Sequence, residues 1–382
     1  MSLRRLILDR IRDAGPITAA EFMRVALYEP SLGYYARRPQ RSGRAGDFYT
    51  SVDVGPLFGS LLAVQIDQMW RLMGSPRPVT IVEAGAGNGR LARDILDELS
   101  STAPDLYEAL QLELVERSEA ARATQAEILG PHADRLVRAG DDLAASMTGI
   151  LYCNELLDAM PTHVVVMTAE GLHEVHVAEE GGRLVERLAT PSTPELTRYL
   201  ERLDIRLQPG WRAEINLDAV DWLRDAMHRL QRGFAIVVDY GHEARRLYSE
   251  AHASGTLATF HRHTKDAGPS AAGPRADAGW LATPGEQDLT AHVDFTSLRL
   301  AAEAEGATTL GLLDQTYFLL GLGIADRLRP SSADSTRDVR QRMATRSLVM
   351  PGGLGSTHKV LLLGKGVGRP QLLGCTAGSR LT

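Results

Sequence analysis

The chain has 382 residues, of which 44% are apolar and 24% charged, the composition of a globular protein with a sizeable core. Its 42 basic and 48 acidic side chains give a formal net charge of −6, which argues against broad binding to the phosphates of a nucleic acid. Two cysteines are too few for a disulfide framework, and no apolar run approaches the ~18 residues of a membrane span. We therefore expect a cytoplasmic protein that binds neither nucleic acid nor membrane.

The first 75 residues are predicted to be mostly helical. The N-terminal segment is a short amphipathic helix that ends at Gly15, and its acidic residues Asp9 and Asp13 are unusual for a transit peptide. Residues 58–73 place their apolar side chains on one helical face, and Gly74 ends that helix. We interpret this region as a helical cover for the domain that follows.

Four short apolar runs predict buried parallel strands, because each is rich in aliphatic residues and ends near a glycine or a polar residue. They are Val79 to Glu83, Leu112 to Glu116, Ile150 to Asn154 and Phe234 to Tyr240. A glycine-rich turn and a helix follow the first run, so strand, helix and strand form a βαβ unit. The predicted fold class is α/β, with a Rossmann-like doubly wound sheet that binds ligands at the carboxyl ends of its strands.

Two stretches interrupt this alternation. The 78 residues between Asn154 and Gly233 are too many for one helical crossover, and they contain β-like runs separated by glycine turns. We expect an inserted antiparallel β/α subdomain there, with a final helix at about 216–231 that Asn216 caps. A Gly, Pro, Ala and Ser-rich stretch predicts a flexible loop. The predicted division is a helical cover over 1–75, core over 76–162, an inserted subdomain over 163–232, and core over 233–382 with a flexible loop at 264–283.

The sharpest motif is EAGAGNG over residues 83–89, between a predicted strand and a helix. Gly85 and Gly87 leave room for a ligand near the backbone, and Gly89 permits close contact between helix and strand. A dinucleotide fingerprint would need glycine where Arg90 stands, and no Gly-Lys-Ser/Thr ending of a phosphate-binding loop is present. The alternating glycines after an acidic residue resemble the S-adenosylmethionine loop of class I methyltransferases.

Two acidic residues support nucleoside binding at that loop. Glu116 ends the second strand, where a carboxylate can accept hydrogen bonds from both hydroxyls of a ribose. Asp141 follows a weaker strand and could accept from the adenine amino group. The alternative is a glycine turn that binds nothing, with Glu116 a solvated strand end.

Several segments, in order along the chain, resemble the MidA-like class I methyltransferases, which include the mitochondrial protein-arginine methyltransferase of complex I assembly. The more specific motifs are GDFYTS, NELLDAMP and DLTAHVDF, within a match that covers about residues 18–365. The further matching runs are LYEPSLGYY, PLFG, EAGAGNGRLARDIL, VERS, VDYG, GTLATFHRH, FLLGLGI and HKVLLLGK. Two departures, Val52-Asp53 in place of Pro-Glu and a longer loop at 264–283, lie where an acceptor would be recognised.

The resemblance implies an S-adenosylmethionine-dependent methyltransferase that N-methylates an arginine guanidinium on a protein or peptide; formation of a homo-oligomer stays open. The alternatives are a small-molecule or peptide-tailoring methyltransferase, and an assembly factor that binds the cofactor without turnover. By resemblance, Asp47 and Thr50 lie over the cofactor. The residues expected to contact the cofactor are Glu83, Gly85, Ala86, Gly87, Gly89, Glu116, Asp141, Asn154, Asp47 and Thr50.

The acceptor site is expected beside the end of the fourth strand. Asn154 could meet the amino-acid part of the cofactor, while Glu155 and Asp158 could hold a cationic acceptor, since carboxylates grip two guanidinium nitrogens. The alternative is a helix over 155–159 that Asn154 caps. His263 could relay a proton or serve as a structural hydrogen-bonder. Glu155, Asp158 and His263 are the predicted catalytic residues.

The segment DLTAHVDF and the end of the last strand carry further polar residues whose roles stay open. Asp239 and Asp288 fit a site as well as a strand pattern. His292 and Asp294 could form a metal pair, but no third ligand at a recognisable spacing accompanies them. We therefore expect no metal.

Overall fold

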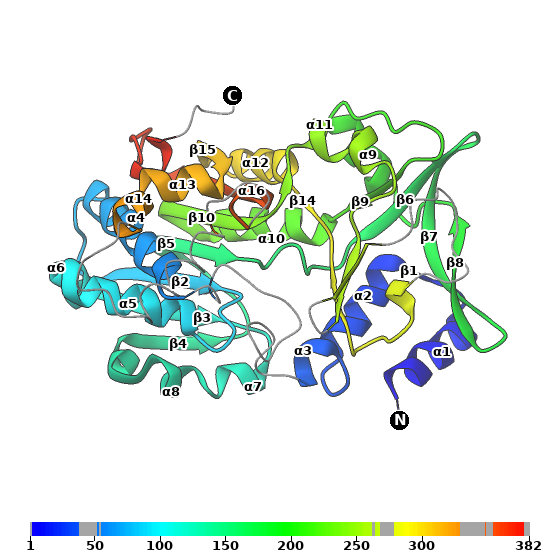
Figure 1. The fold of residues 1–382 in the computed structure, drawn as a ribbon, viewed down its shortest axis with the longest axis horizontal. Coiled ribbons are helices and arrows are strands. Elements are labelled where there is room, and N and C mark those ends of the chain that lie inside the picture. Colours follow the sequence, from blue (N-terminus) through cyan, green and yellow to red (C-terminus); the bar gives the residue numbers. More distant parts are fainter. Residues whose placement is uncertain are drawn as a thin grey trace.

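The computed structural model describes residues 2–37, 52, 55–261, 264–267, 279–328, 348 and 354–377. Its largest element is an eight-stranded sheet of order β15-β16-β10-β5-β2-β3-β4, with β14 paired to β10 (Figure 1). Strands β4, β3, β2, β5 and β10 are parallel, whereas β16 is antiparallel to both of its neighbours. The strands are β2 (Val79–Ala84), β3 (Leu110–Val115), β4 (Leu136–Gly140), β5 (Met147–Asn154), β10 (Leu230–His242), β14 (Val293–Asp294), β15 (Thr308–Asp314) and β16 (His358–Lys365).

Helices cover both faces of this sheet, as the α/β prediction requires. Phe58, Ile95 and Phe318 are fully or almost fully buried on one face, and Leu223 and Leu298 on the other. Each such side chain contributes about 1.5–3 kcal/mol by leaving water. One face carries α4 (Leu57–Leu72), α5 (Arg90–Thr102), α6 (Pro104–Ala109), α8 (Gln125–Leu129) and α13 (Gln315–Gly321), and the other α10 (Leu217–Arg229) and α12 (Phe295–Ala304).

A second, antiparallel sheet of five strands forms a separate lobe (Figure 1). Its strands are β1 (Ile17–Thr18), β6 (His163–Thr168), β7 (Gly171–Glu180), β8 (Arg183–Ala189) and β9 (Arg212–Ile215). The inserted antiparallel subdomain is thus confirmed as part of the fold. Three of its strands coincide with the β-like runs that the glycine turns separate in the sequence.

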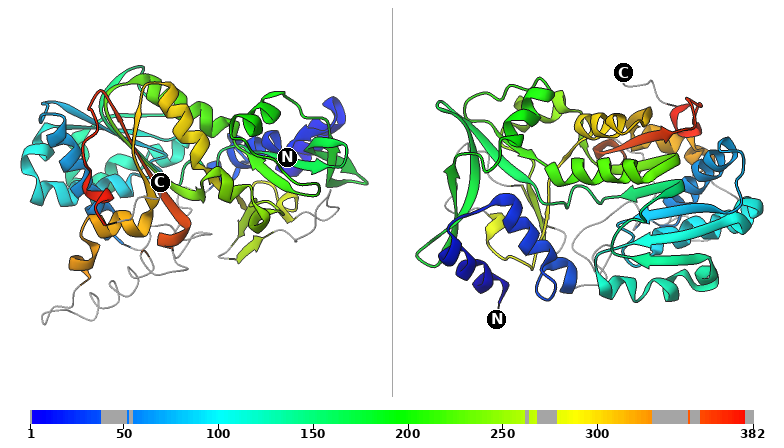
Figure 2. Two further views of the ribbon diagram at one scale, coloured as in Figure 1. Left: turned by 90° about the horizontal axis from the view of Figure 1, so that it is seen from above. Right: turned by 180° about the vertical axis from the view of Figure 1, so that it is seen from behind.

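The N-terminal helices divide between the two sheets (Figure 2). Helices α1 (Leu3–Ala14) and α2 (Ala19–Tyr28) bury Ile7 and Phe22 against the second sheet, whereas α4 packs on the large one. The short α3 (Tyr34–Arg37) follows α2. The boundaries of the predicted helical cover remain a prediction.

Helix α10 begins where the sequence predicts. Asn216 precedes it and accepts a hydrogen bond from the backbone N–H of Ala219 at 2.9 Å, the N-cap that the sequence predicts. The helix ends at Arg229, earlier than predicted, because β10 begins at Leu230 and Gly233 lies within that strand.

A third sheet of three antiparallel strands lies between the two larger ones (Figure 1). It contains β11 (Ala258–His261), β12 (Thr264–Ala267) and β13 (Asp288–Thr290), and η3 (Gly279–Leu281) precedes β13. The two ends of the loop predicted over 264–283 form β12 and η3. Its middle, residues 268–278, lies outside the described residues. Trp280 is buried, packs edge-on against Phe22 at 5.0 Å between ring centroids, and donates from its indole N–H to Glu186 at 2.7 Å.

The remaining short elements join these layers. They are α7 (Glu119–Arg122), α9 (Glu195–Arg202), α11 (Ala244–Leu247), α14 (Ile324–Arg327), α16 (Leu354–Thr357), η1 (Gly130–Arg135), η2 (Glu250–His252) and η5 (Leu373–Cys375). Within the part of the chain that the structure describes, every helix falls short of the length and apolar character of a bilayer span.

Candidate active site

The glycine-rich turn connects β2 to α5 at the carboxyl edge of the large sheet. Gly85, Gly87 and Gly89 have φ of +73°, +53° and +85°, a left-handed conformation that favours glycine. A Cβ atom at Gly87 would meet no atom of the described residues within 4 Å, whereas one at Gly85 would lie 3.0 Å from the Leu156 side chain. Within the described part of the chain, open space therefore lies over Gly87, while Gly85 packs against the turn that follows β5.

Hydrogen bonds from β3 hold this turn in place. The N–H groups of Gly85 and Ala86 donate to the carbonyl of Val115 at 2.9 and 3.0 Å. The Glu116 carboxylate accepts from the N–H of Gly87 at 2.9 Å and from that of Ser118 at 2.8 Å. Glu116 thus faces the glycine turn, where the sequence places it, and each oxygen keeps a lone pair for a further donor.

The other predicted nucleoside contacts lie around the same edge. Asp141 is exposed and directly follows β4, whose last residue Gly140 accepts the N–H of Glu116 at 2.8 Å. Asn154 ends β5; its Nδ2 donates to Glu155 at 3.2 Å, and its buried Oδ1 has no hydrogen-bond partner in the described structure. The Oδ1 of Asn154 can accept a hydrogen bond from an amino group, and the Glu116 carboxylate can accept from ribose hydroxyls. This edge of the sheet therefore suits a ligand that carries both groups.

Glu83 lies beneath the turn and is almost fully buried. Its carboxyl group accepts a hydrogen bond from the Tyr152 hydroxyl at 3.0 Å. Burial raises the pKa of Glu83 to about 8, so the group keeps its proton near neutral pH. The hydrogen bond between Tyr152 and Glu83 supports the glycine turn from the protein interior. A direct contact between Glu83 and the cofactor remains a prediction.

The turn after β5 is not a helix, so the capping interpretation of Asn154 is wrong. Glu155 has φ of +51°, which is incompatible with a helix start. The next three N–H groups, of Leu156, Leu157 and Asp158, instead converge on one oxygen of Asp239 at 3.2, 2.8 and 3.3 Å. Asp239 on β10 therefore shapes the turn that carries the predicted acceptor residues.

Four acidic residues gather at this place, and we call them the carboxylate cluster: Glu155, Asp158, Asp239 and Asp288. Three of them are almost fully buried, and the Glu155 side chain is 8% exposed. Burial, together with the charges of Asp239, Glu155 and Asp288, raises the pKa of Asp158 well above its usual range. Burial likewise raises the pKa of Asp239 to about 7. One oxygen of Asp158, Oδ1, has no hydrogen-bond partner in the described residues.

Neighbouring aromatic side chains complete the surroundings of the carboxylate cluster. The Tyr35 hydroxyl of α3 donates to Asp288 at 3.1 Å, and the Tyr28 hydroxyl of α2 donates to the carbonyl of Ala159 at 2.9 Å. The Tyr240 ring packs against His358 with 3.8 Å between ring centroids. The N-terminal helices thus reach the acidic turn, whereas the predicted residues Asp47, Thr50 and His263 lie outside the described residues.

The sequence singled out Glu155 and Asp158 but left Asp239 and Asp288 open. A signal was present for Asp239, because it stands at the carboxyl edge of its strand, as Glu116 does next to β3. Asp288 begins the motif DLTAHVDF, but the sequence does not show which residues it meets, since the third sheet that positions it is formed by separate segments.

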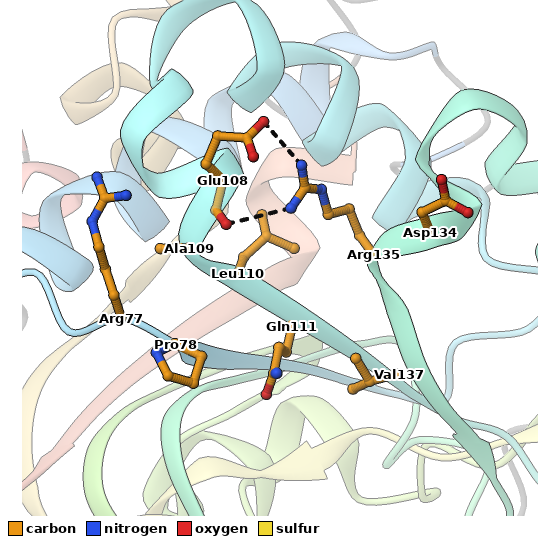
Figure 3. A pocket seen from close by; sticks show the side chains of 9 residues that line it. All are labelled: Arg77, Pro78, Glu108, Ala109, Leu110, Gln111, Asp134, Arg135 and Val137. Carbon is orange, nitrogen blue, oxygen red and sulfur yellow. Dashed lines mark hydrogen bonds and ion pairs between the residues drawn. The ribbon is translucent and has the colours of Figure 1, made fainter.

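A pocket on the opposite edge of the large sheet is unrelated to this site (Figure 3). It is open to solvent, and an ion pair between Arg135 and Glu108 at 2.9 Å crosses its wall. Its lining residues are Arg77, Pro78, Glu108, Ala109, Leu110, Gln111, Asp134, Arg135 and Val137. These residues surround the amino ends of β2, β3 and β4, whereas ligands of such sheets bind at the carboxyl ends.

Comparison with known proteins identifies the family and the fold. A family model described as S-adenosyl-L-methionine-dependent methyltransferase matches residues 61–313. The chain belongs to the MidA-like family of these methyltransferases. It is therefore an S-adenosylmethionine-dependent methyltransferase, and S-adenosylmethionine is its cofactor.

Members of the family align over nearly the whole chain. "Protein arginine methyltransferase NDUFAF7, mitochondrial" of Mus musculus is 30% identical, over 85% of this chain and 75% of its own length. The Drosophila melanogaster homolog is 28% identical, over 96% and 85%. A crystal structure from Burkholderia thailandensis, bound to S-adenosyl-homocysteine, is 30% identical with a TM-score of 0.88, over 99% of this chain and 95% of that one.

One expectation from the sequence is contradicted by these relatives. We expected a cytoplasmic protein, but the curated members of the methyltransferase family named above are mitochondrial.

Proposed function

We propose that this methyltransferase N-methylates the guanidinium group of an arginine on a protein. The carboxylate cluster carries the proposal, because the turn that bears Glu155 and Asp158 packs against the glycine turn. Leu156, which lies between Glu155 and Asp158, fills the space next to Gly85. The curated relatives are named protein arginine methyltransferases, which agrees with an acidic acceptor site.

The chemistry of the acceptor explains why several carboxylates are needed. A guanidinium ion is planar, carries five N–H donors and keeps its charge throughout the physiological range, so it is a poor nucleophile. Two carboxylates that accept from two of its nitrogens orient the third and concentrate electron density on it. S-adenosylmethionine supplies a methyl group on a positively charged sulfur.

The buried carboxylates also fit the proton balance of the reaction. When the nitrogen gains its methyl group it gives up one proton, which a nearby base must accept. Asp158 and Asp239 have raised pKa values in the free protein because they are buried close to other acids. In its charged form, a carboxylate with a raised pKa takes up a proton more readily than an ordinary one, so it is a suitable acceptor.

The roles of the turn and the cluster can be separated by substitution. We expect Glu155→Gln to leave affinity for S-adenosylmethionine within a few-fold, and to lower methyl transfer to protein in a cell extract by at least about 100-fold. The matched control is Glu113→Gln, which removes a carboxylate that pairs with Arg138 on the same sheet. Methyl incorporation is measured with S-adenosylmethionine whose methyl group carries deuterium.

Other outcomes of that assay would point to other functions. Full transfer by Glu155→Gln would contradict the proposed acceptor site. Label confined to small molecules would indicate a tailoring enzyme, and cofactor binding without any transfer would indicate an assembly factor.

A further inference from the structure

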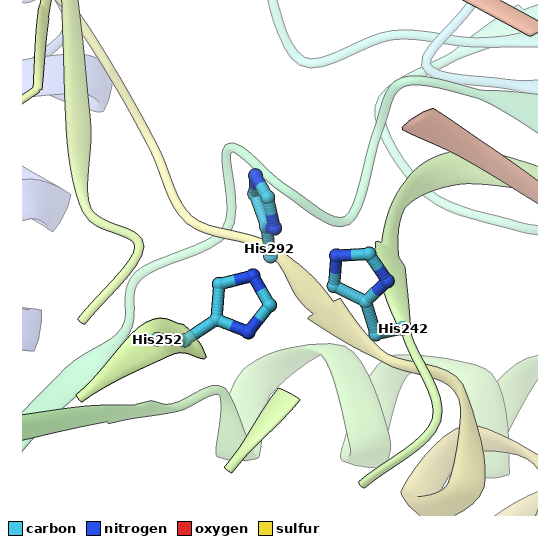
Figure 4. Close-up of side chains that lie close together, drawn as sticks. All are labelled: His242, His252 and His292. Carbon is cyan, nitrogen blue, oxygen red and sulfur yellow. The ribbon is translucent and has the colours of Figure 1, made fainter. Parts of the chain in front are cut away.

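Three histidines from remote segments meet just beyond the carboxyl end of β10 (Figure 4). His242 ends β10, His252 ends η2, and His292 lies between β13 and β14. Their ring centroids are 4.9, 5.4 and 5.9 Å apart. One ligand nitrogen of each lies within 4.8 Å of the other two.

Hydrogen bonds fix two of these residues in positions suited to ligation. The Nδ1 of His252 contacts the carbonyl of Arg246 at 3.0 Å, and because a carbonyl only accepts, Nδ1 carries the hydrogen. The lone pair of His252 is therefore on Nε2. The backbone N–H of His292 donates to the Thr256 hydroxyl at 3.1 Å, which anchors the third segment. A donor bond from the distal nitrogen to a carbonyl is typical of metal-bound histidine.

His242 is the most buried of the three. It is 8% exposed, and its Nδ1 has no hydrogen-bond partner within the described residues. A buried imidazole nitrogen that has no such partner is available to a metal ion.

We propose that His242, His252 and His292 bind one divalent transition-metal ion, with Zn²⁺ as the best match. Neutral imidazoles suit this class of ion, and three protein ligands leave the fourth position of a tetrahedral site open. Zn–N bonds of about 2.0–2.1 Å need ligand nitrogens about 3.4 Å apart, which modest side-chain rotation from the present arrangement provides.

The position of the site suggests what the ion does. His242 is three residues beyond Asp239 on β10, and His292 is four residues beyond Asp288. The ion therefore ties together two of the segments that supply the carboxylate cluster. Ala291 strengthens this link, because its N–H donates to the carbonyl of Asp158 at 3.0 Å.

The test is metal binding by the full chain, independent of methyl transfer. After chelator treatment, titration with Zn²⁺ alone should give about one ion per chain, and Co²⁺ should give the visible absorption bands of a low-coordinate imidazole site. His252→Ala and His292→Ala should each weaken Zn²⁺ binding by at least about 100-fold. His228→Ala, an exposed histidine on α10, is the matched control and should bind as the wild type does.

Two results would overturn the site. Wild-type protein that binds less than about 0.1 ion per chain has no such site. Equal affinity in His252→Ala, His292→Ala and wild type would place the ion elsewhere. Because His242 is buried and its variant could fail to fold, the two less buried histidines carry the test, with circular dichroism confirming that each variant is folded.

Discussion

The two halves of the proposed active site are built in different ways. The proposed cofactor half is one stretch of consecutive residues, the glycine turn, joined by Glu116, which follows the neighbouring strand β3. The proposed acceptor half is the carboxylate cluster, whose members come from the turn after β5, from β10 and from β13. A local motif thus forms the glycine turn, while the packing of remote segments forms the carboxylate cluster.

The largest effect is expected from closing the open space over the glycine turn. Gly87→Val should weaken binding of S-adenosylmethionine by more than about 100-fold, because the new side chain enters the space where the ligand would lie and φ of +53° strains it. Calorimetric titration measures the affinity.

A matched control separates the backbone strain that valine causes from its filling of the space where the ligand would lie. Gly181 in the turn between β7 and β8 has φ of +57° and equally open surroundings. Gly181→Val should lose similar stability but keep cofactor affinity. If both variants bound the cofactor like the wild type, the glycine turn would not be the cofactor site.

Methyl transfer to the acceptor should depend on pH, with kcat/KM changing by up to about 10-fold per pH unit. The folded pKa of Asp239 is raised from 3.8 to about 7, so the group is neutral below pH 7 and charged above it. Since the guanidinium stays charged, kcat/KM for the acceptor should rise with pH and level off above about 7. Over the same range the free protein should become less stable, because the folded state holds the proton between pH 3.8 and 7.

A steady-state pH profile with a fixed, saturating cofactor concentration measures this dependence. Asp239→Asn should flatten the profile. Values of kcat/KM that rise as the pH falls would contradict a cationic acceptor among these carboxylates.

A smaller effect is expected where a helix supports the acidic turn. Asn216 caps α10 and also donates to the carbonyls of Leu157 and Met160 at 2.9 and 3.3 Å. Asn216→Ala should cost about 1 kcal/mol of unfolding free energy and raise the acceptor KM a few-fold.

Thr18→Ala provides the comparison, because Thr18 makes the same kind of cap on a different helix, α2, through the N–H of Glu21 at 3.0 Å. It should lose similar stability with an unchanged KM. Thermal unfolding and steady-state kinetics report the two quantities, and an equal rise of KM in both variants would show that stability alone is responsible.

The contrast between the halves explains what could be predicted from the sequence. The meeting of Glu116 with the glycine turn could be predicted, because the spacing of strand, glycines and helix is a local signal. The alternative of a helix over 155–159 was wrong, because Asp239, far along the chain, binds the N–H groups that a helix start would leave free.

Residues that meet only through tertiary packing left no comparable trace. His242, His252 and His292 are separated by 10 and 40 positions, and no motif links them. The pairing of β14 with β10 and the hydrogen bond from His292 to Thr256 bring the third histidine to the other two. For the same reason Asp288 could be noted in the sequence but not assigned to the acceptor site.

If the carboxylate cluster presents an arginine side chain to the methyl donor, the transferred methyl group must end on that side chain. The direct measurement is tandem mass spectrometry of proteins labelled by the wild-type enzyme in a cell extract, with deuterated methyl groups as the tag. We expect the tag on a guanidinium nitrogen of arginine, and we expect it to be absent when Glu155→Gln replaces the wild type. A tag on lysine, on a carboxylate or on a hydroxyl group would contradict it.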